Sequence, residues 1–248
     1  MRGLFCCLLA LGAILLGGCI DGEEEIFIGA DGTARVKAIY RIPAMIFSAK
    51  DAEDLKTTID QEVGGHENLK LITNKIEKEN GEQVITLEIQ TDDLMALGEV
   101  LPEHPSDEEV SNADKIWHTI VGRIKVNMAG LSVTMSRDVD LGPLLDKHLG
   151  KSSATLLGDA QFRYIVHLPE AVESSNAHQV VNEGRTLKWN YKLSDCGKKP
   201  ISLSMVASVP LPLWIYGLAA VLLIAIAWVF YAALRRLRSR NEEVSAVR

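Results

Sequence analysis

Two apolar segments, one at each end of the chain, limit what the residues between them can become. The first covers residues 4–16, and the second covers residues 213–234. About 190 residues lie between them, with charged and apolar residues interleaved as in a folded domain. We therefore expect one ordinary domain with a membrane attachment at each end.

The first apolar segment has the pattern of a bacterial lipoprotein signal. Arg2 precedes the segment, and Leu16-Gly17-Gly18-Cys19 follows it as a lipobox. About 13 apolar residues are too few to span a bilayer as a helix, which needs roughly 20. The pattern predicts that residues 1–18 are a signal peptide and that a diacylglycerol and an acyl chain such as palmitate attach to Cys19. Residues 19–23 then form a short tether. The alternative is an uncleaved signal anchor in which Cys19 has no special role.

The second apolar segment has the features of a single transmembrane helix. Residues 213–234 carry no charge, and as a helix they would be about 33 Å long, which is enough to cross the hydrocarbon core. Aromatic residues lie near both ends of the segment, and four arginines follow it within residues 235–240. By the positive-inside rule, the tail 235–248 lies in the cytoplasm. The alternative is a helix buried in a protein core. The sequence thus predicts a protein of the bacterial cytoplasmic (inner) membrane with its main domain, residues 24–209, outside the cytoplasm.

Charge and cysteine content narrow the function of this main domain. The chain has a formal net charge of −7, and the arginines of the tail make the remainder more acidic still. An acidic domain is a poor binder of nucleic acid, so we expect no nucleic-acid partner. Cys6 and Cys7 lie in the signal, which leaves Cys196 alone in the domain beside the lipidated Cys19. No internal disulfide is therefore expected, and the fold must depend on its own core.

Alternating apolar and polar residues between turn signals predict a series of antiparallel hairpins. The clearest pair is joined by Asp31-Gly32, a strong hairpin turn sequence. Further turns are expected at Asn80-Gly81 and Ala129-Gly130. The expected strands are residues 24–28, 34–42, 69–77, 83–90, 116–127, 131–139, 162–168, 186–193 and 201–209.

One amphipathic helix is expected between the first two hairpins. Ser48 and Asp51 approximate a capping box, and Phe47 could pack on Ala52 as a staple. Apolar residues then recur at helical spacing up to Val63. Two weaker helices are expected at residues 91–101 and 142–149. The predicted fold class is α+β, with a curved antiparallel sheet of hairpins packed on one main helix in a helix-grip-like arrangement.

Residues that could carry chemistry are few and lack the spacing of known sites. The histidines at 66, 104, 118, 148, 167 and 178 do not have metal-site spacing, and His167 is expected at the surface. Asp138 and Asp140 form a lone Asp-x-Asp, and Cys196 follows a strand beside two lysines. The acidic run 106–109 with Asp114 resembles a solvated loop more than a calcium loop. Trp189 and Tyr191 are expected in the core. We predict no catalytic, cofactor-binding or metal-binding residue, and no enzymatic activity.

The whole layout resembles the LppM-type lipoprotein family. The similarity rests on the lipobox ending at Cys19, the Asp31-Gly32 hairpin, Trp189-Asn190-Tyr191, and the segment 213–234 with its arginines. The resemblance implies a helix-grip-like α+β domain suited to hydrophobic or lipid ligands. It implies no site residues.

Two non-enzymatic functions follow from these features. The first is a module that binds a lipid or another hydrophobic ligand at the membrane surface. The second is a scaffold whose sheet edge or acidic loop docks an envelope membrane complex. A hydrolase or transferase is disfavoured because its motifs are missing; Asp138, Asp140, His167 and Cys196 would be its first residues to test.

Overall fold

The computed structural model describes residues 20–44, 47–98, 112–149, 157, 160–196, 199–210, 215, 217–218 and 220–231. The signal peptide, Cys19, the acidic run 106–109 and the tail 235–248 lie outside these residues. The chain divides into two compact units, Met1–Val209 and Pro210–Arg248. Residues 220–231 of the second unit are helical, and apolar side chains there are exposed, for example Leu223 and Trp228. Within the described part of the chain, no helix is long and apolar enough to span a membrane.

The first hairpin is confirmed, and its first strand starts earlier than expected. Strand β1 (Asp21–Ile28) pairs antiparallel with β2 (Ala34–Pro43), from Asp21 opposite Arg41 to Ile28 opposite Ala34. Gly32 in the turn has a φ of +87°, a value that glycine adopts without strain. Because β1 begins at Asp21, only Ile20 separates the folded domain from Cys19.

The main helix is confirmed in its cap, its buried face and its end. Helix α2 (Ala49–Gly64) starts after Ser48, whose hydroxyl accepts from the Asp51 N–H while the Asp51 carboxylate accepts from the Ser48 N–H. This is a complete capping box. The buried residues follow one helical stripe: Ala52, Leu55, Thr58, Ile59 and Val63. The helix packs against strand β3 (Leu69–Glu79) and against a second helix, α3 (Asn112–Val121).

The second hairpin is also confirmed. Strand β4 (Glu82–Thr91) follows β3 through a turn in which Asn80 and Gly81 have positive φ, 49° and 86°. The helix expected at residues 91–101 is a short 3-10 helix, η1 (Leu94–Gly98), and residues 99–101 lie outside the described residues.

The strand expected at residues 116–127 is wrong over its first half. Helix α3 occupies Asn112–Val121, and strand β5 begins only at Arg123 and ends at Ala129. Ala113, Ile116, Trp117 and Ile120 are buried at helical spacing, because this segment packs on α2. Gly122 makes the change of direction at a φ of +65°, and a Cβ there would lie 2.3 Å from the Asp138 carbonyl oxygen. No other residue type fits this junction without a backbone shift.

The remaining predicted elements are present, with three additions. The strand at 131–139, the helix at 142–149 and the strands at 162–168, 186–193 and 201–209 are all confirmed. Strands β8 and β9 and helix α6 are short and were not predicted. The observed bounds are β6 Ser132–Val139, α4 Gly142–Leu149, β7 Gln161–His167, β8 Val172–Ser175, β9 Gln179–Val181, β10 Thr186–Lys192, α6 Leu193–Cys196 and β11 Ile201–Ser208.

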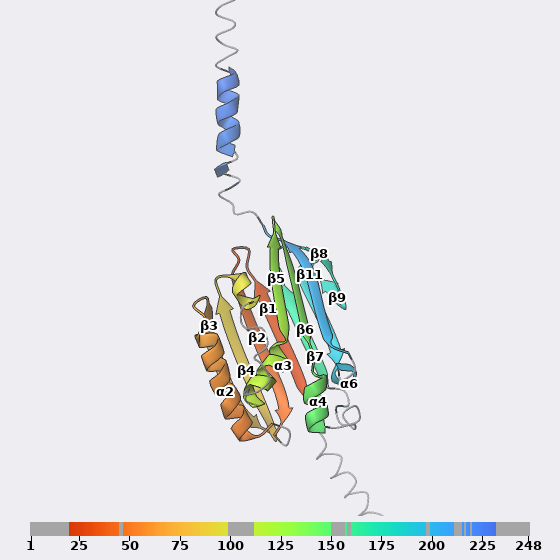
Figure 1. Ribbon diagram of the computed structural model, residues 1–248. Coiled ribbons are helices and arrows are strands. Elements are labelled where there is room, and N and C mark those ends of the chain that lie inside the picture. Colours follow the sequence, from red (N-terminus) through yellow and green to blue (C-terminus); the bar gives the residue numbers. More distant parts are fainter. Residues whose placement is uncertain are drawn as a thin grey trace, which may run out of the picture. The chain divides into compact units, whose positions relative to one another are not determined.

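The strands form two sheets, which corrects the expected single antiparallel sheet. One sheet has seven strands in the order β3-β4-β2-β1-β7-β10-β9, and the other has four in the order β5-β6-β11-β8. The β1–β7 pair is parallel, with Gly22 opposite Phe162, so the larger sheet is mixed. Both sheets and the helices contribute to one buried core. The α+β class holds, and Figure 1 shows α2 and α3 over one face of the seven-stranded sheet.

The chain enters and leaves the first unit at opposite ends of its strands. Ile201 of β11 pairs with Val139 at one end of the four-stranded sheet, and Ser208 pairs with Ser132 at the other. Tyr191 of β10 pairs with Phe162 at the start of β7, and its hydroxyl donates to the Ser202 carbonyl next to Ile201. The start of β7, and therefore of its parallel neighbour β1, lies at the Ile201 end. Strands of eight residues separate the two ends by about 27 Å. Figure 1 shows α4 at the entry end and the β5–β6 turn at the exit end.

Candidate functional site

A partly open apolar pocket lies at the entry end of the domain. It has a volume of about 60 Å³ and is formed where α3 and α4 meet β1, β2 and β7. Its lining residues are Ile20, Asp21, Tyr40, Ile42, Phe47, Ile116, Ile120, Leu141, Leu144, Leu145, Phe162 and Leu193. The first of these lining residues along the chain, Ile20, directly follows Cys19 in the sequence.

The size and lining of the pocket limit what it can accept. Sites for drug-sized ligands usually have volumes of about 300–1,000 Å³. A volume of about 60 Å³ is roughly twice the share of one water molecule in the liquid, so it can hold about two methylene groups. Except for Asp21 and Tyr40, every lining side chain is purely apolar. The pocket suits the end of an alkyl chain, and it offers no arrangement of polar groups for a reaction.

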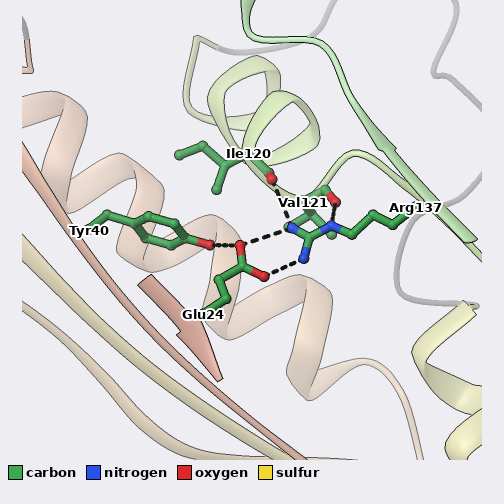
Figure 2. Close-up of polar contacts among 5 residues, drawn as sticks. All are labelled: Glu24, Tyr40, Ile120, Val121 and Arg137. Atoms are coloured by element: carbon green, nitrogen blue, oxygen red, sulfur yellow. Dashed lines mark hydrogen bonds and ion pairs between the residues drawn. The ribbon is translucent and has the colours of Figure 1, made fainter. Parts of the chain in front are cut away.

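A buried polar network shares Tyr40 with the lining of the pocket (Figure 2). Arg137 on β6 forms an ion pair with Glu24 on β1, and its Nη2 donates to Glu24 Oε1 at 3.0 Å. The Tyr40 hydroxyl on β2 donates to the same oxygen of Glu24. Both charged side chains are less than 5% exposed. This network joins the two sheets through side chains.

The end of helix α3 completes the network. Arg137 Nε donates to the Val121 carbonyl at 2.7 Å, and Arg137 Nη2 donates to the Ile120 carbonyl at 3.0 Å. Both carbonyls belong to the last turn of α3, where no further helical N–H can reach them. The Arg137 guanidinium also lies over the Tyr164 ring at 5.1 Å. Arg137 therefore holds the two sheets and the end of α3 in one arrangement.

Burial sets the ionisation of these groups. Burial by itself lowers the pKa of Arg137, but the adjacent Glu24 carboxylate more than offsets this, and the net effect raises that pKa above its ordinary value. Burial, and next the charge of Glu24, raise the pKa of Tyr40 and of Tyr164 well above the ordinary value. Arg137 is thus charged and both tyrosines are neutral at physiological pH.

These shifts predict a loss of stability at high pH. Tyrosines in the unfolded chain lose their protons near pH 10, whereas Tyr40 and Tyr164 in the folded chain keep theirs to higher pH. Above about pH 10 the folded state therefore binds more protons than the unfolded state, and the free energy of unfolding falls as pH rises. Burial likewise raises the pKa of the Cys196 thiol to about 11, so its contribution begins to fall near pH 9. We therefore expect the urea midpoint to start decreasing near pH 9 and to decrease more steeply between pH 10 and 11.

The variant Tyr164→Phe provides the control for this pH effect. Within the described residues the buried Tyr164 hydroxyl has no hydrogen-bond partner, so its removal should cost little or stabilise the protein at pH 7. It should also make the decrease above pH 10 shallower. An equally steep decrease in this variant would show that Tyr164 does not contribute.

None of the described residues that were singled out from the sequence for possible chemistry lines the pocket. His167 is partly exposed, as expected; its Nε2 lies 2.8 Å from Glu25 Oε1 and its ring stacks on Phe27. Asp140 accepts from the Gly142 N–H at 3.0 Å and so caps α4, while Asp138 is exposed on β6. Among the described residues, no cluster of three histidine, cysteine or acidic side chains could hold a metal ion.

Cys196 and the aromatic pair on β10 have structural surroundings. Cys196 is buried, and burial followed by the nearby Asp195 charge raises the pKa of its thiol to about 11, which opposes reactivity. Trp189 is 2% exposed in the core and Tyr191 packs partly buried against it, as expected. The Tyr191 hydroxyl donates to the Ser202 carbonyl at 2.9 Å and so ties β10 to β11.

Sequence reasoning did not identify Glu24 and Arg137, although a signal was present. Glu24 alternates in phase with the buried Gly22 and Ile26, and Arg137 alternates with Met135 and Val139. Two opposite charges, each on the apolar phase of its strand, indicate a buried ion pair.

The comparisons with known proteins support the fold. No protein-family model matches the chain, and no curated protein matches it in sequence. A solved structure, the NMR structure of the folded domain of LppM from Mycobacterium tuberculosis, is similar with a TM-score of 0.50 and 15% sequence identity. The match covers 79% of this chain and 93% of that chain. It shows an LppM-like fold, which agrees with the family resemblance at the level of the fold alone.

Proposed function

We propose that this chain is a non-enzymatic envelope lipoprotein that binds the end of an acyl chain in its apolar pocket at the membrane surface. One anchor is the lipid on Cys19, and the other is the segment 213–234 in the cytoplasmic membrane, with residues 235–248 in the cytoplasm. The position of the pocket supports this proposal. Its lining includes Ile20, so the predicted lipid attachment holds the opening close to the bilayer.

The two anchors also constrain how the domain rests on the membrane. Ile20 and Val209 lie at opposite ends of the strands, and only a few residues separate each from its anchor. Such short tethers reach about 14 Å at most, whereas the strands are about 27 Å long. If both anchors enter one bilayer, the strands must run along its surface. The pocket then opens near the lipid headgroups, where an acyl chain can reach it.

A pocket-filling variant tests the proposal. Leu144 is a half-buried lining residue on α4, and Leu144→Trp should occupy the space with protein atoms. Excluding about two methylene groups removes on the order of 1.6 kcal/mol of binding free energy, or roughly tenfold in affinity. Native mass spectrometry of the full chain in mild detergent should show lipid bound in addition to the covalent anchor. That bound fraction should fall several-fold in Leu144→Trp.

The control for this experiment adds the same bulk elsewhere. Ile72 on β3 is 43% exposed and does not line the pocket, so Ile72→Trp should keep the bound lipid. Wild-type protein that carries only the covalent lipid would contradict the proposal, as would equal lipid retention by Leu144→Trp.

A second function is favoured by one sheet edge. Strand β9 ends the seven-stranded sheet, and Val180 and Val181 on it are 48% and 41% exposed. An exposed apolar edge can accept a strand from an envelope protein partner. A photoreactive residue at position 180 should then capture one reproducible partner in intact cells, and capture of none would remove this alternative.

A further inference from the structure

The tip of the β5–β6 hairpin exposes apolar side chains. Met128 is 54% exposed and Leu131 is 52% exposed, while Gly130 between them adopts a φ of +64° in the turn. Residues 128–131 carry no charge. Large apolar side chains are scattered over most protein surfaces, but two at one projecting turn form a compact apolar end.

The chain leaves the domain beside this tip. The Val209 N–H donates to the Leu131 carbonyl at 2.7 Å, and Ser208 pairs with Ser132. Only three residues separate Val209 from the apolar segment that begins at residue 213. At most about 14 Å of extended chain can therefore lie between the tip and the start of that segment.

We propose that the β5–β6 tip inserts Met128 and Leu131 into the apolar part of a lipid bilayer. The proposal rests on the membrane anchor at 213–234 described above and adds a contact made by the folded domain itself. The anchor would hold the tip within reach of the bilayer, and burial of both side chains in lipid would favour insertion by the hydrophobic effect.

The polar groups near the tip fit a shallow insertion. Glu173 on β8 accepts hydrogen bonds from the Ser132 and Ser208 hydroxyls at 3.3 and 2.6 Å. This carboxylate marks the level at which the domain becomes polar, about one residue behind Leu131. The predicted contact is therefore limited to the turn and does not extend along β5 and β6.

Depth measurements along the β5–β6 hairpin test the proposal. The full chain would be placed in nanodiscs of phosphatidylcholine, with a spin label at Met128→Cys or Leu131→Cys. Thr134→Cys and Asp138→Cys serve as controls, because both residues are exposed on β6 at increasing distance from the tip. Cys196 is buried and should not take up the label, which the unsubstituted chain checks directly.

We expect oxygen to relax the labels at 128 and 131 several-fold more than a water-soluble nickel complex does. At 134 and 138 we expect the nickel complex to relax the labels more than oxygen does. Labels at 128 and 131 that behave as in water would overturn the proposal, and a protein partner would then be sought for the tip. Equal immersion at all four sites would also overturn it, since the sheet face would then contact lipid. A chain that does not enter nanodiscs at all would instead remove the anchor at 213–234 and the tip contact with it.

Discussion

Replacing Arg137 with methionine should destabilise the domain by about 3–5 kcal/mol, the range measured when one partner of a buried ion pair is removed. Glu24 would be left with Tyr40 as its only remaining partner in this network, and the Ile120 and Val121 carbonyls would lose their donor. Methionine fills part of the space of the arginine stem, so the loss would come mainly from the unpaired polar groups. Urea unfolding of the full chain in mild detergent at pH 7 measures this difference.

A surface arginine on the other, seven-stranded sheet is the matched control. Arg163 on β7 contacts Glu23 at 2.9 Å and Asp21 at 3.3 Å, but its side chain is 42% exposed. Arg163→Met should change the free energy of unfolding by at most about 1 kcal/mol. An equal decrease in the free energy of unfolding in the two variants would mean that the buried network stabilises the domain no more than the exposed ion pairs do.

A double variant separates the contribution of the two charges to stability from the contribution of the volume that their side chains fill. Combining Glu24→Leu with Arg137→Met removes both charges, and replacement of a buried pair by apolar residues is often neutral or stabilising. The double variant should therefore recover much of the stability lost in Arg137→Met, a non-additivity expected of residues in direct contact. Full recovery is not expected, because the two carbonyls of α3 would still lack a donor.

The second large effect is expected at Trp189. Trp189→Ala should cost about 3–5 kcal/mol, because the indole is 2% exposed and its removal leaves a cavity in the core. Its Nε1–H also donates at 2.8 Å to Asn176 Oδ1, which accepts from the Ser204 N–H as well. The substitution thus weakens the connection between β10 and β11. The same unfolding measurement tests it.

An exposed residue on the neighbouring strand provides its control. Val180 of β9 pairs with Leu187 of β10 and is 48% exposed, so Val180→Ala should change stability by no more than about 0.5 kcal/mol. A loss below 1 kcal/mol in Trp189→Ala would show that the core collapses around the vacant space, contrary to this account.

Local signals in the sequence predicted local structure well. The Asp31-Gly32 turn, the capping box of Ser48 and Asp51, and the alternation of β10 are all present as expected. These features depend on residues that are close in sequence, so the pattern contains the information. The segment from Ile116 failed because its apolar residues fit both periods over a short run, and only packing on α2 selects the helix.

The arrangement of the sheets depends on contacts that no local pattern contains. Gly22 pairs with Phe162 in the parallel β1–β7 pair, 140 positions away, and β6 and β11 pair within a separate sheet. The pocket could not be predicted from the sequence for the same reason. Its lining residues come from elements that are far apart along the chain, namely β1, β2, β7, α3, α4 and α6. The pairing of Glu24 with Arg137 bridges the two sheets, so neither partner could be chosen before the sheets were known.

Cross-linking with a photoactivatable fatty acid determines whether the pocket takes the end of an acyl chain. The fatty acid would be incorporated into the lipids of cells that make the full chain, and cross-linked peptides would be mapped after irradiation. We expect cross-links on α3 and α4, at Ile116 and Leu144 among others, that are lost in Leu144→Trp and kept in Ile72→Trp. Cross-links confined to 213–234, with none on α3 or α4, would contradict it.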